Sequence, residues 1–532
     1  MKNFLLIAVL SVVFLSCKTT KDTNVTNQTT KIVAPANPTD YANTITTDEL
    51  KEMLYVYASD EFEGRNTGDA GHDKAVDYLT QFYKDQNITS AIKGANYIQN
   101  VPLNRLFVPE VELEVNGKSY GAFDSMISRS YSYSGEVTGK EVVYVGFGID
   151  EENYSDYSNL DVKDKIVVAK AGEPMNEDGS FTISGTTEKT KWSNGRQGRR
   201  SKRDAAVANG AKAFIYAEDA SFNYYSKVIK QYYDGDKTLG ISLDSGDKEI
   251  LFLLVSEAVG NEIVGGALES NEVKTIPAMI SASQKSKSKP LNSSNVAAII
   301  EGSEFPNEYI VVSAHLDHVG VNDKGEVYNG ADDDGSGTVA VLEMAEAFNQ
   351  AVKAGHAPKR SVVFLHVTGE EKGLLGSRYY TDMDPIFPLE DTVANLNIDM
   401  IGRTDPKRTE GSRNYIYLIG SDKLSTELHN LSETVNSKYT NIELDYKYND
   451  DKDPNRFYYR SDHYNFAKND IPIIFYFNGT HADYHKVGDT PDKIQYDLLE
   501  NRTRLVFYTA WELANRTDRI VVDKAKEAIG SN

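Results

Sequence analysis

The stretch "EYIVVSAHLD" (residues 308–317) is an apolar run that ends in a histidine and an aspartate. Three later stretches have the same form: "RSVVFLHVTG" (360–369), "VANLNIDMIG" (393–402) and "IPIIFYFNG" (471–479). Runs so rich in valine, isoleucine and phenylalanine are typical of strands that are buried on both faces. Helical runs separate several of them, notably residues 338–353. The pattern predicts an α/β domain with a mostly parallel central sheet and helices on both faces.

Side chains that can bind a metal follow the ends of these predicted strands. In chain order they are His315, Asp317, Glu370, Glu371, Asp399, His481 and His485. The carboxyl ends of parallel strands meet at one edge of a sheet, and ligands bind there. Imidazoles and carboxylates without a thiolate favour zinc, or less strongly manganese or cobalt, over an iron–sulfur or structural zinc site. We therefore expect a catalytic metal site at this edge.

The segment "GADDDGSG" (330–337) places three aspartates in a row between glycines. It fits a solvated turn, a calcium loop or part of the metal site. The calcium interpretation is supported by Asp332, Asp334, Ser336 and Glu343, which match the spacing of an EF-hand loop. The residues before the loop are rich in turn formers, however, so the entering helix of an EF-hand is missing.

A serine nucleophile is the other enzymatic interpretation. It is prompted by Ser461, Asp462 and His463 in "RSDHYNF". Adjacent residues cannot face one another as a catalytic triad, and the chain has no GxSxG segment. The sequence therefore disfavours it.

Five motifs together resemble one family. "AHLDH", "NGADDDGSG", "TGEEKGLLGS", "NIDMIGR" and "DYHKVGDTP" are similar, in order and spacing, to the co-catalytic di-zinc exopeptidases, which include bacterial aminopeptidases and glutamate carboxypeptidase. "EFEGRNTGDAG" and "SDHYNF" also resemble recurring elements of that family. The resemblance covers the predicted catalytic domain and implies the zinc-exopeptidase fold with two zinc ions per chain.

The resemblance also implies the metal ligands. They are His315 and Asp399 on one zinc, Glu371 and His485 on the other, and Asp333 bridging both. Charge supports this set, because three carboxylates and one hydroxide neutralise two buried Zn²⁺ ions. Asp332 and Asp334 are then expected to shape the loop, and the Asp333–Asp334 peptide bond is expected to be cis.

Three further residues receive roles from the same resemblance. Asp317 would orient His315, and Glu370 would be the general base that activates a metal-bridging hydroxide. Tyr484 would donate a hydrogen bond to the developing oxyanion.

The predicted activity is that of a zinc-dependent exopeptidase acting on peptides. An aminopeptidase is preferred, because a carboxylate-rich site can hold a substrate's α-ammonium group. A carboxypeptidase remains an alternative, since Arg403, Arg456 or Arg460 could bind a terminal carboxylate. A receptor-like binding protein on this fold is a second alternative, but such relatives have lost metal ligands. The full ligand set also argues against the one-zinc branch that cyclises N-terminal glutamine.

The domain boundaries follow from changes in pattern. Residues 45–119 and 286–520 are expected to form the two parts of the peptidase domain. Residues 120–285 are rich in short β-runs and contain no histidine. Within them, "YSNLDVKDKIVVAKAG" and "AAVANGAKAFIYAE" resemble a protease-associated domain. That resemblance implies a lid or substrate-gating role.

The first 17 residues read as a secretory signal, with a lysine and then an apolar run. Cys17 is the only cysteine, so no intramolecular disulfide is possible. Its place resembles a bacterial lipoprotein box, although Phe14 stands where leucine is usual. The resemblance implies lipid attachment at Cys17, a flexible tether over 18–44 and a location in the cell envelope, on the periplasmic side or the cell surface.

The net charge restricts the partners. With 57 basic and 79 acidic residues the formal charge is −22, and a nucleic-acid ligand would require a basic face. Nucleic acid is therefore not expected as a partner. The expected partners are peptide substrates and, through the lipid anchor, a membrane.

Overall fold

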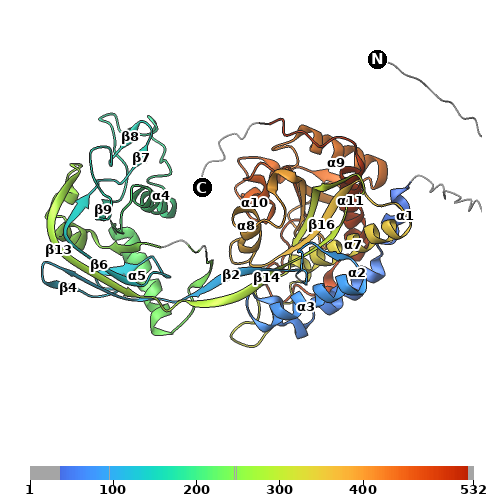
Figure 1. The fold of residues 1–532 in the computed structure, drawn as a ribbon, viewed down its shortest axis with the longest axis horizontal. Helices are drawn as coiled ribbons and strands as arrows, with labels where there is room; N and C mark the ends of the chain where they lie inside the picture. Colours follow the sequence, from blue (N-terminus) through green and yellow to red (C-terminus); the bar gives the residue numbers. More distant parts are fainter. Residues whose placement is uncertain (1–35, 95, 245, 247–248, 525–532) are drawn as a thin grey trace, which may run out of the picture. The chain divides into compact units, whose positions relative to one another are not determined.

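A computed structural model of the chain describes residues 36–94, 96–244, 246 and 249–524. The predicted lipoprotein signal with Cys17 and most of the tether (18–44) lie outside the described residues, so they stay predictions. None of the helices in the described ranges has the length and apolar character needed to cross a membrane. The described chain contains two large sheets, which are taken in turn (Figure 1).

The first sheet has ten strands in the order β11-β2-β14-β16-β15-β17-β20-β18-β19, with β1 beside β14. Their bounds are β1 (Thr89–Ser90), β2 (Ile98–Leu106), β11 (Gly240–Leu243), β14 (Lys289–Ile300), β15 (Phe305–His315), β16 (Arg360–Val367), β17 (Thr392–Ile398), β18 (Tyr415–Ile419), β19 (Glu443–Asp445) and β20 (Ile473–Phe477). The strands predicted from the sequence are β15, β16, β17 and β20. They lie side by side as a parallel block.

Antiparallel pairs flank this block on both sides. On one side β14 pairs antiparallel with β16, and on the other β18 pairs antiparallel with β20. The α/β class is confirmed, and the parallel pairing that the sequence predicts is concentrated at the centre of a mixed sheet. Within the block, β16, β17 and β20 are buried at every position, which fits strands that are covered on both faces.

Helices cover both faces of this sheet. One face carries α1 (Pro38–Ala42), α2 (Thr47–Tyr57), α3 (Ala70–Asp85), α7 (Gly337–Lys353), α9 (Thr426–Tyr439) and α11 (Tyr496–Asn515), and the other carries α8 (Leu375–Asp382) and α10 (His463–Ala467). Figure 1 shows α7 and α11 on one side of β16 and α8 and α10 on the other. Successive residues of β15 alternate between the two cores: Ile310 and Val312 pack in the first, Val311 in the second.

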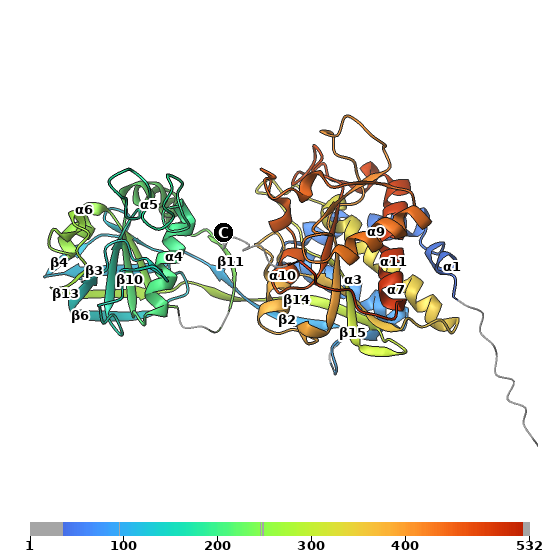
Figure 2. The same ribbon diagram turned by 90° about the horizontal axis from the view of Figure 1, so that it is seen from above.

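The second sheet has eight strands in the order β4-β3-β13-β6-β9-β10-β12-β5 (Figure 2). They are β3 (Glu110–Val115), β4 (Lys118–Tyr120), β5 (Met126–Ser128), β6 (Gly135–Tyr144), β9 (Ile166–Lys170), β10 (Ala213–Ala217), β12 (Leu251–Val255) and β13 (Lys274–Lys285). The same stretch of the chain also contains three helices and a small pair of strands. These are α4 (Gly195–Ala208), α5 (Asp219–Asp234), α6 (Glu257–Ile263), β7 (Asp150–Glu151) and β8 (Tyr154–Ser155).

This sheet does not follow the predicted boundary at residue 120. It begins at Glu110, because β3 pairs with β13, and β11 leaves it to pair with β2 of the first sheet. The exposed positions of β3 are glutamates and its buried positions are Leu113 and Val115, so the alternation indicates a strand but does not identify its partner. Partners distant in the sequence decide to which sheet such a strand belongs. The resemblance of this region to a protease-associated domain stays a prediction.

Glu343, the last position of the alternative calcium loop, lies inside α7 and is 4% exposed. Burial and the nearby carboxylates of Glu49 and Glu346 raise its pKa to about 8 from 4.5. Between these values the folded protein binds more protons than the unfolded chain, so this group's contribution to stability falls as pH rises. We expect Glu343→Gln to exceed the parent in free energy of unfolding by on the order of 2–4 kcal/mol at about pH 8.5.

At about pH 4, below the unfolded-state pKa of 4.5, the two proteins should be nearly equal in stability, because Glu343 is then largely neutral in the unfolded chain as well as in the folded protein. Urea unfolding at both pH values measures the difference. Glu52→Gln, which changes an exposed carboxylate of α2, is the matched control and should give the same difference from the parent at both pH values. A pH-independent difference for Glu343→Gln would contradict the raised pKa.

Candidate metal centre

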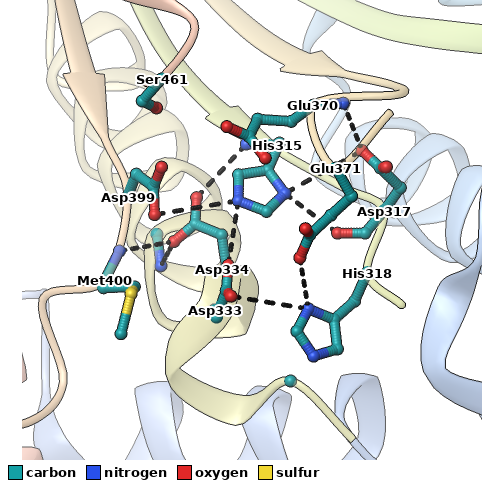
Figure 3. A network of polar contacts seen from close by, with 12 residues as sticks. His315, Asp317, His318, Asp333, Asp334, Glu370, Glu371, Asp399, Met400 and Ser461 are labelled. Atoms are coloured by element: carbon teal, nitrogen blue, oxygen red, sulfur yellow. Dashed lines mark hydrogen bonds and ion pairs between the residues drawn. The ribbon is translucent and has the colours of Figure 1, made fainter. Parts of the chain in front are cut away.

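The predicted ligands meet at the carboxyl edge of the parallel block. His315 ends β15, Glu371 follows β16, and Asp399 follows β17. His485 comes from the loop after β20, and Asp333 from the turn Ala331–Ser336 that precedes α7. Figure 3 shows His315, Glu371 and Asp399 around Asp333.

The first group of ligand atoms comes from His315, Asp333 and Asp399. The Nε2 atom of His315 is 3.3 Å from Oδ1 of Asp333 and 3.8 Å from Oδ1 of Asp399. On the other side of the ring, Nδ1–H donates to the backbone carbonyl of Asp317 at 2.9 Å. This hydrogen bond assigns the proton to Nδ1 and leaves the lone pair of Nε2 directed at the carboxylates.

Asp317 therefore orients His315 through its backbone rather than its side chain. Its Oδ1 is 3.9 Å from the His315 ring nitrogen. The carboxylate instead accepts hydrogen bonds from the Thr67 hydroxyl at 2.8 Å and the backbone N–H of Glu370 at 3.1 Å. The expected role of Asp317 is thus divided: the carbonyl holds the ligand, and the carboxylate holds the segment that carries Glu370.

The second group is built around the other oxygen of Asp333. His485 Nε2 is 3.0 Å from Asp333 Oδ2 and 3.1 Å from Glu371 Oε2. His318 joins this group, with Nδ1 at 2.9 Å from Glu371 Oε1 and 3.8 Å from Asp333 Oδ2. Sequence analysis missed His318, although it is the last residue of "AHLDH". Its close spacing after His315 and Asp317 was the available signal.

The two groups fit a pair of metal ions that share Asp333. The ligand atoms of His315, Asp333 and Asp399 lie within 4.8 Å of one another, and so do those of His318, Asp333 and Glu371. The predicted ligand His485 lies outside these two sets and approaches the second through its contacts with Asp333 and Glu371. Several buried polar atoms here have no hydrogen-bond partner in the protein: His315 Nε2, both ring nitrogens of His318, Asp333 Oδ2 and Glu371 Oε1. Buried polar atoms are normally paired, and imidazole nitrogens and carboxylate oxygens are ligands that zinc prefers.

The electrostatics of the cluster favour positive charge. Burial lowers the pKa of His485, but the carboxylates of Asp333 and Glu371 outweigh burial and raise it to about 10. Burial likewise raises the pKa of Asp333, but His315, His318 and His485 hold it well below its usual value. Carboxylates kept ionised in the interior require cations beside them.

The two aspartates that flank Asp333 shape the loop, as predicted. The Asp334 carboxylate accepts three backbone hydrogen bonds, from the N–H groups of His315, Gly337 and Met400. Asp332 accepts from the N–H of Gly402 and the hydroxyl of Ser336. The peptide bond between Asp333 and Asp334 is cis, as the resemblance implied. Because these carboxylates serve the fold and Glu343 is packed elsewhere in α7, the calcium interpretation is wrong.

A pocket opens directly beside the metal ligands. Its lining residues are Asp333, Glu370, Asp399, Met400, Phe457, Arg460, Phe475, Phe477, Thr480 and Tyr484. Glu370 belongs to neither ligand group, so its carboxylate faces the pocket without a ligand role. The Tyr484 ring stacks on His485 with centroids 4.0 Å apart, and burial raises the pKa of its hydroxyl, which therefore stays a donor.

Residues 295–510 match Peptidase family M28. We call this part of the chain, which is similar to the peptidases of that family, the M28 domain. The M28 domain contains all five predicted ligands, His318, and the predicted acid–base residue Glu370.

Individual proteins are similar to the chain over different lengths. The chain is 24% identical over 500 residues to probable leucine aminopeptidase 2 of Aspergillus oryzae, covering 88% of this chain and 83% of that protein. Leupeptin-inactivating enzyme 1 of Streptomyces exfoliatus is 30% identical over 188 residues, or 35% of this chain and 36% of that protein. An aminopeptidase structure from Aneurinibacillus sp. strain AM-1 aligns over 92% of this chain and 98% of its own at 20% identity, with a TM-score of 0.46.

Two buried residues that sequence analysis missed clamp the aspartate loop of the M28 domain. Asp489 accepts hydrogen bonds from the backbone N–H groups of Asp332 and Asp333, at 3.0 and 3.1 Å. Arg65 donates to the carbonyls of Asn329 and Gly330 at 2.7 and 2.8 Å. Both occur in motifs that resemble the family, "DYHKVGDTP" and "EFEGRNTGDAG". Their function as clamps depends on contacts with a loop far away in the sequence.

The remaining candidates from the sequence have structural partners in the M28 domain. His481, a possible ligand from its place after β20, lies outside both ligand groups and pairs with Asp332 at 3.3 Å. Ser461 accepts from the Asn397 amide, and His463 Nε2 contacts the carbonyl of Tyr458. The serine and histidine of "RSDHYNF" thus have separate partners, in agreement with the rejection of a catalytic triad.

Proposed function

We propose that the protein is a zinc-dependent aminopeptidase that removes N-terminal residues from peptides and holds two zinc ions per chain. The observation that carries this proposal is the shared carboxylate: Asp333 belongs to both groups of ligand atoms. A carboxylate between two sets of histidine and acidic ligands is the arrangement that places two metal ions a few ångströms apart. The match to Peptidase family M28 supports the same conclusion.

The residues of the pocket supply the steps of hydrolysis. Zinc, when bound, acts as a Lewis acid and lowers the pKa of water. Glu370 lines the pocket outside both ligand groups, where it takes a proton from the attacking water and passes it to the leaving amine. The Tyr484 hydroxyl, in the same lining, donates a hydrogen bond to the oxyanion that develops on the substrate.

The charge of the pocket favours an aminopeptidase over a carboxypeptidase. Asp333, Glu370 and Asp399 are the acidic groups of the lining and suit a substrate's α-ammonium group. Of the three arginines that could bind a terminal carboxylate, Arg403 and Arg456 are absent from the lining, and Arg460 is in it as a single positive charge. Arg403 pairs with Asp483 at 3.2 Å. The receptor-like alternative is disfavoured because the metal ligands are retained and lie together.

Paired substrates with free and blocked amines test the proposal. Leucine p-nitroanilide should be hydrolysed by the zinc-loaded protein, and the N-acetylated compound should not. A chelator should abolish the reaction, and added zinc should restore it. Equal hydrolysis of the blocked substrate would contradict an aminopeptidase, and activity that survives complete removal of the metal would contradict the metal mechanism.

The location and the role of the second sheet rest on the sequence alone. Lipid attachment at Cys17 would place the enzyme in the cell envelope, which membrane fractionation tests. The resemblance of residues 120–285 to a protease-associated domain would give that region a role in substrate access.

A further inference from the structure

One cationic side chain lies in the lining of the pocket beside the metal centre. The acidic groups of the lining are Asp333, Glu370 and Asp399, and Arg460 is its only basic residue among the parts of the chain described. The rest of the wall is mainly apolar, formed by Met400, Phe457, Phe475, Phe477, Thr480 and Tyr484. The pocket therefore offers acidic groups for an α-ammonium, an apolar wall and a separate positive charge.

Arg460 is held in place without a carboxylate partner. Its guanidinium carbon is 5.1 Å from the centroid of the Phe457 ring, and Nη2 lies 3.4 Å from the Tyr484 hydroxyl. The ion pairs found among the described residues include none for Arg460, whereas Arg403 nearby is paired with Asp483. A guanidinium that packs on aromatic rings while keeping its donors available is suited to binding a carboxylate.

The basic character continues into an adjoining pocket. This second pocket shares Phe457, Arg460, Thr480 and Tyr484 with the first and adds Lys407 and Lys486. Lys486 donates to the carbonyl of Ala482, which keeps its ammonium group beside this pocket. In a chain with a formal charge of −22, a group of three basic residues at the substrate pocket is a local exception that favours an anionic ligand.

We propose that Arg460 is a specificity-determining residue that binds a carboxylate of the substrate, so that the preferred peptides are acidic ones. The proposal rests on the proposed aminopeptidase function. The carboxylate has two possible sources: the side chain of an N-terminal glutamate or aspartate, or the C-terminus of a short peptide. A glutamate side chain suits the chemistry of the lining, which offers an apolar wall for its methylene groups and the Arg460 guanidinium for its carboxylate.

Matched substrates separate the two sources. The glutamate and glutamine p-nitroanilides have nearly the same shape, differ in side-chain charge and lack a C-terminal carboxylate. For the zinc-loaded parent we expect the glutamate substrate to have a kcat/KM about 10- to 100-fold higher, the range for a charge-assisted hydrogen bond. The dipeptide Leu-Ala and its C-terminal amide test the other source in the same way.

The variants compare ratios rather than absolute rates. For whichever substrate pair the parent distinguishes, the ratio of the two kcat/KM values should fall to near one in Arg460→Met. Arg460→Lys should retain part of the parent's preference for the substrate with the carboxylate. Arg456→Met is the matched control, because Arg456 packs on Tyr459 and is not in the pocket lining. Its ratios should equal those of the parent. Discrimination by the glutamate pair assigns the side chain, and discrimination by the dipeptide pair assigns the C-terminus.

Failure of this proposal differs from failure of the proposed function. If the parent hydrolyses leucine p-nitroanilide but prefers neither carboxylate substrate, or if Arg460→Met keeps the preference, the assignment of Arg460 is overturned and the aminopeptidase stands. If no free-amine substrate is hydrolysed, calorimetric titration of the zinc-loaded protein with L-glutamate and L-glutamine tests Arg460 directly. Tighter binding of glutamate that Arg460→Met abolishes supports the site, and equal binding overturns it.

Discussion

Replacing Asp333 with asparagine should remove both metal ions at once and reduce kcat/KM by about 10⁴-fold or more, because metal and acid–base assistance are lost together. The substitution keeps the shape of the side chain but removes its charge. Asp333 is the one residue that belongs to both ligand groups, with one oxygen facing His315 and the other His485. Metal content by mass spectrometry and turnover of leucine p-nitroanilide measure the two effects.

Two other substitutions make this prediction specific. Asp399→Asn changes only the first ligand group, so this variant should keep one metal ion per chain. Asp323→Asn removes an exposed carboxylate from the loop between β15 and α7 and should keep both ions and full turnover. Two ions per chain in Asp333→Asn would contradict the shared role of this carboxylate.

Replacing Glu370 with glutamine should lower kcat by about 10³- to 10⁴-fold while the metal content stays that of the parent. Glu370 lines the pocket with Asp333 and Asp399 but lies in neither ligand group, so its loss removes proton transfer without removing a ligand. Its backbone N–H is held by the Asp317 carboxylate, which this substitution leaves in place. Turnover, zinc content and the thermal unfolding midpoint should be measured on the same preparation.

Glu326→Gln is the matched control for this second variant, because Glu326 is an exposed glutamate on the loop before α7. It should have the kcat of the parent. Normal turnover in Glu370→Gln would rule out Glu370 as the general base. Loss of zinc from the same variant would instead show that the carboxylate acts as a ligand.

Much of the fold and the site was predictable because the relevant signals are local. The four central strands contain the apolar runs, and His315 ends one of them while Glu371 and Asp399 come shortly after two others. Strand burial and ligand type are properties of short segments. The strand β3 lies on the other side of the predicted boundary at residue 120, because its alternating pattern indicates a strand but only its pairing with β13 shows to which sheet it belongs.

The residues that sequence reasoning missed act through contacts between distant segments. His318 has a role only because Glu371, from another strand end, lies 2.9 Å from its ring. Asp489 matters because the loop with Asp333 folds against it. The spacing of His318 after His315 and Asp317, and the place of Asp489 in a motif that resembles the family, were signals in the sequence, but neither identifies the distant partner.

The sequence by itself determined the chemistry that is available: apolar strands, histidines and carboxylates at their ends, and an order of motifs that resembles one family. Only the tertiary structure decided how those groups are used. In the structure the carbonyl of Asp317, rather than its carboxylate, accepts the hydrogen bond from His315. Arg460 lines the pocket, whereas Arg403 pairs with Asp483. The physical reason is that residue type and hydrophobic pattern are encoded locally, whereas distances between side chains depend on strand order and long-range packing.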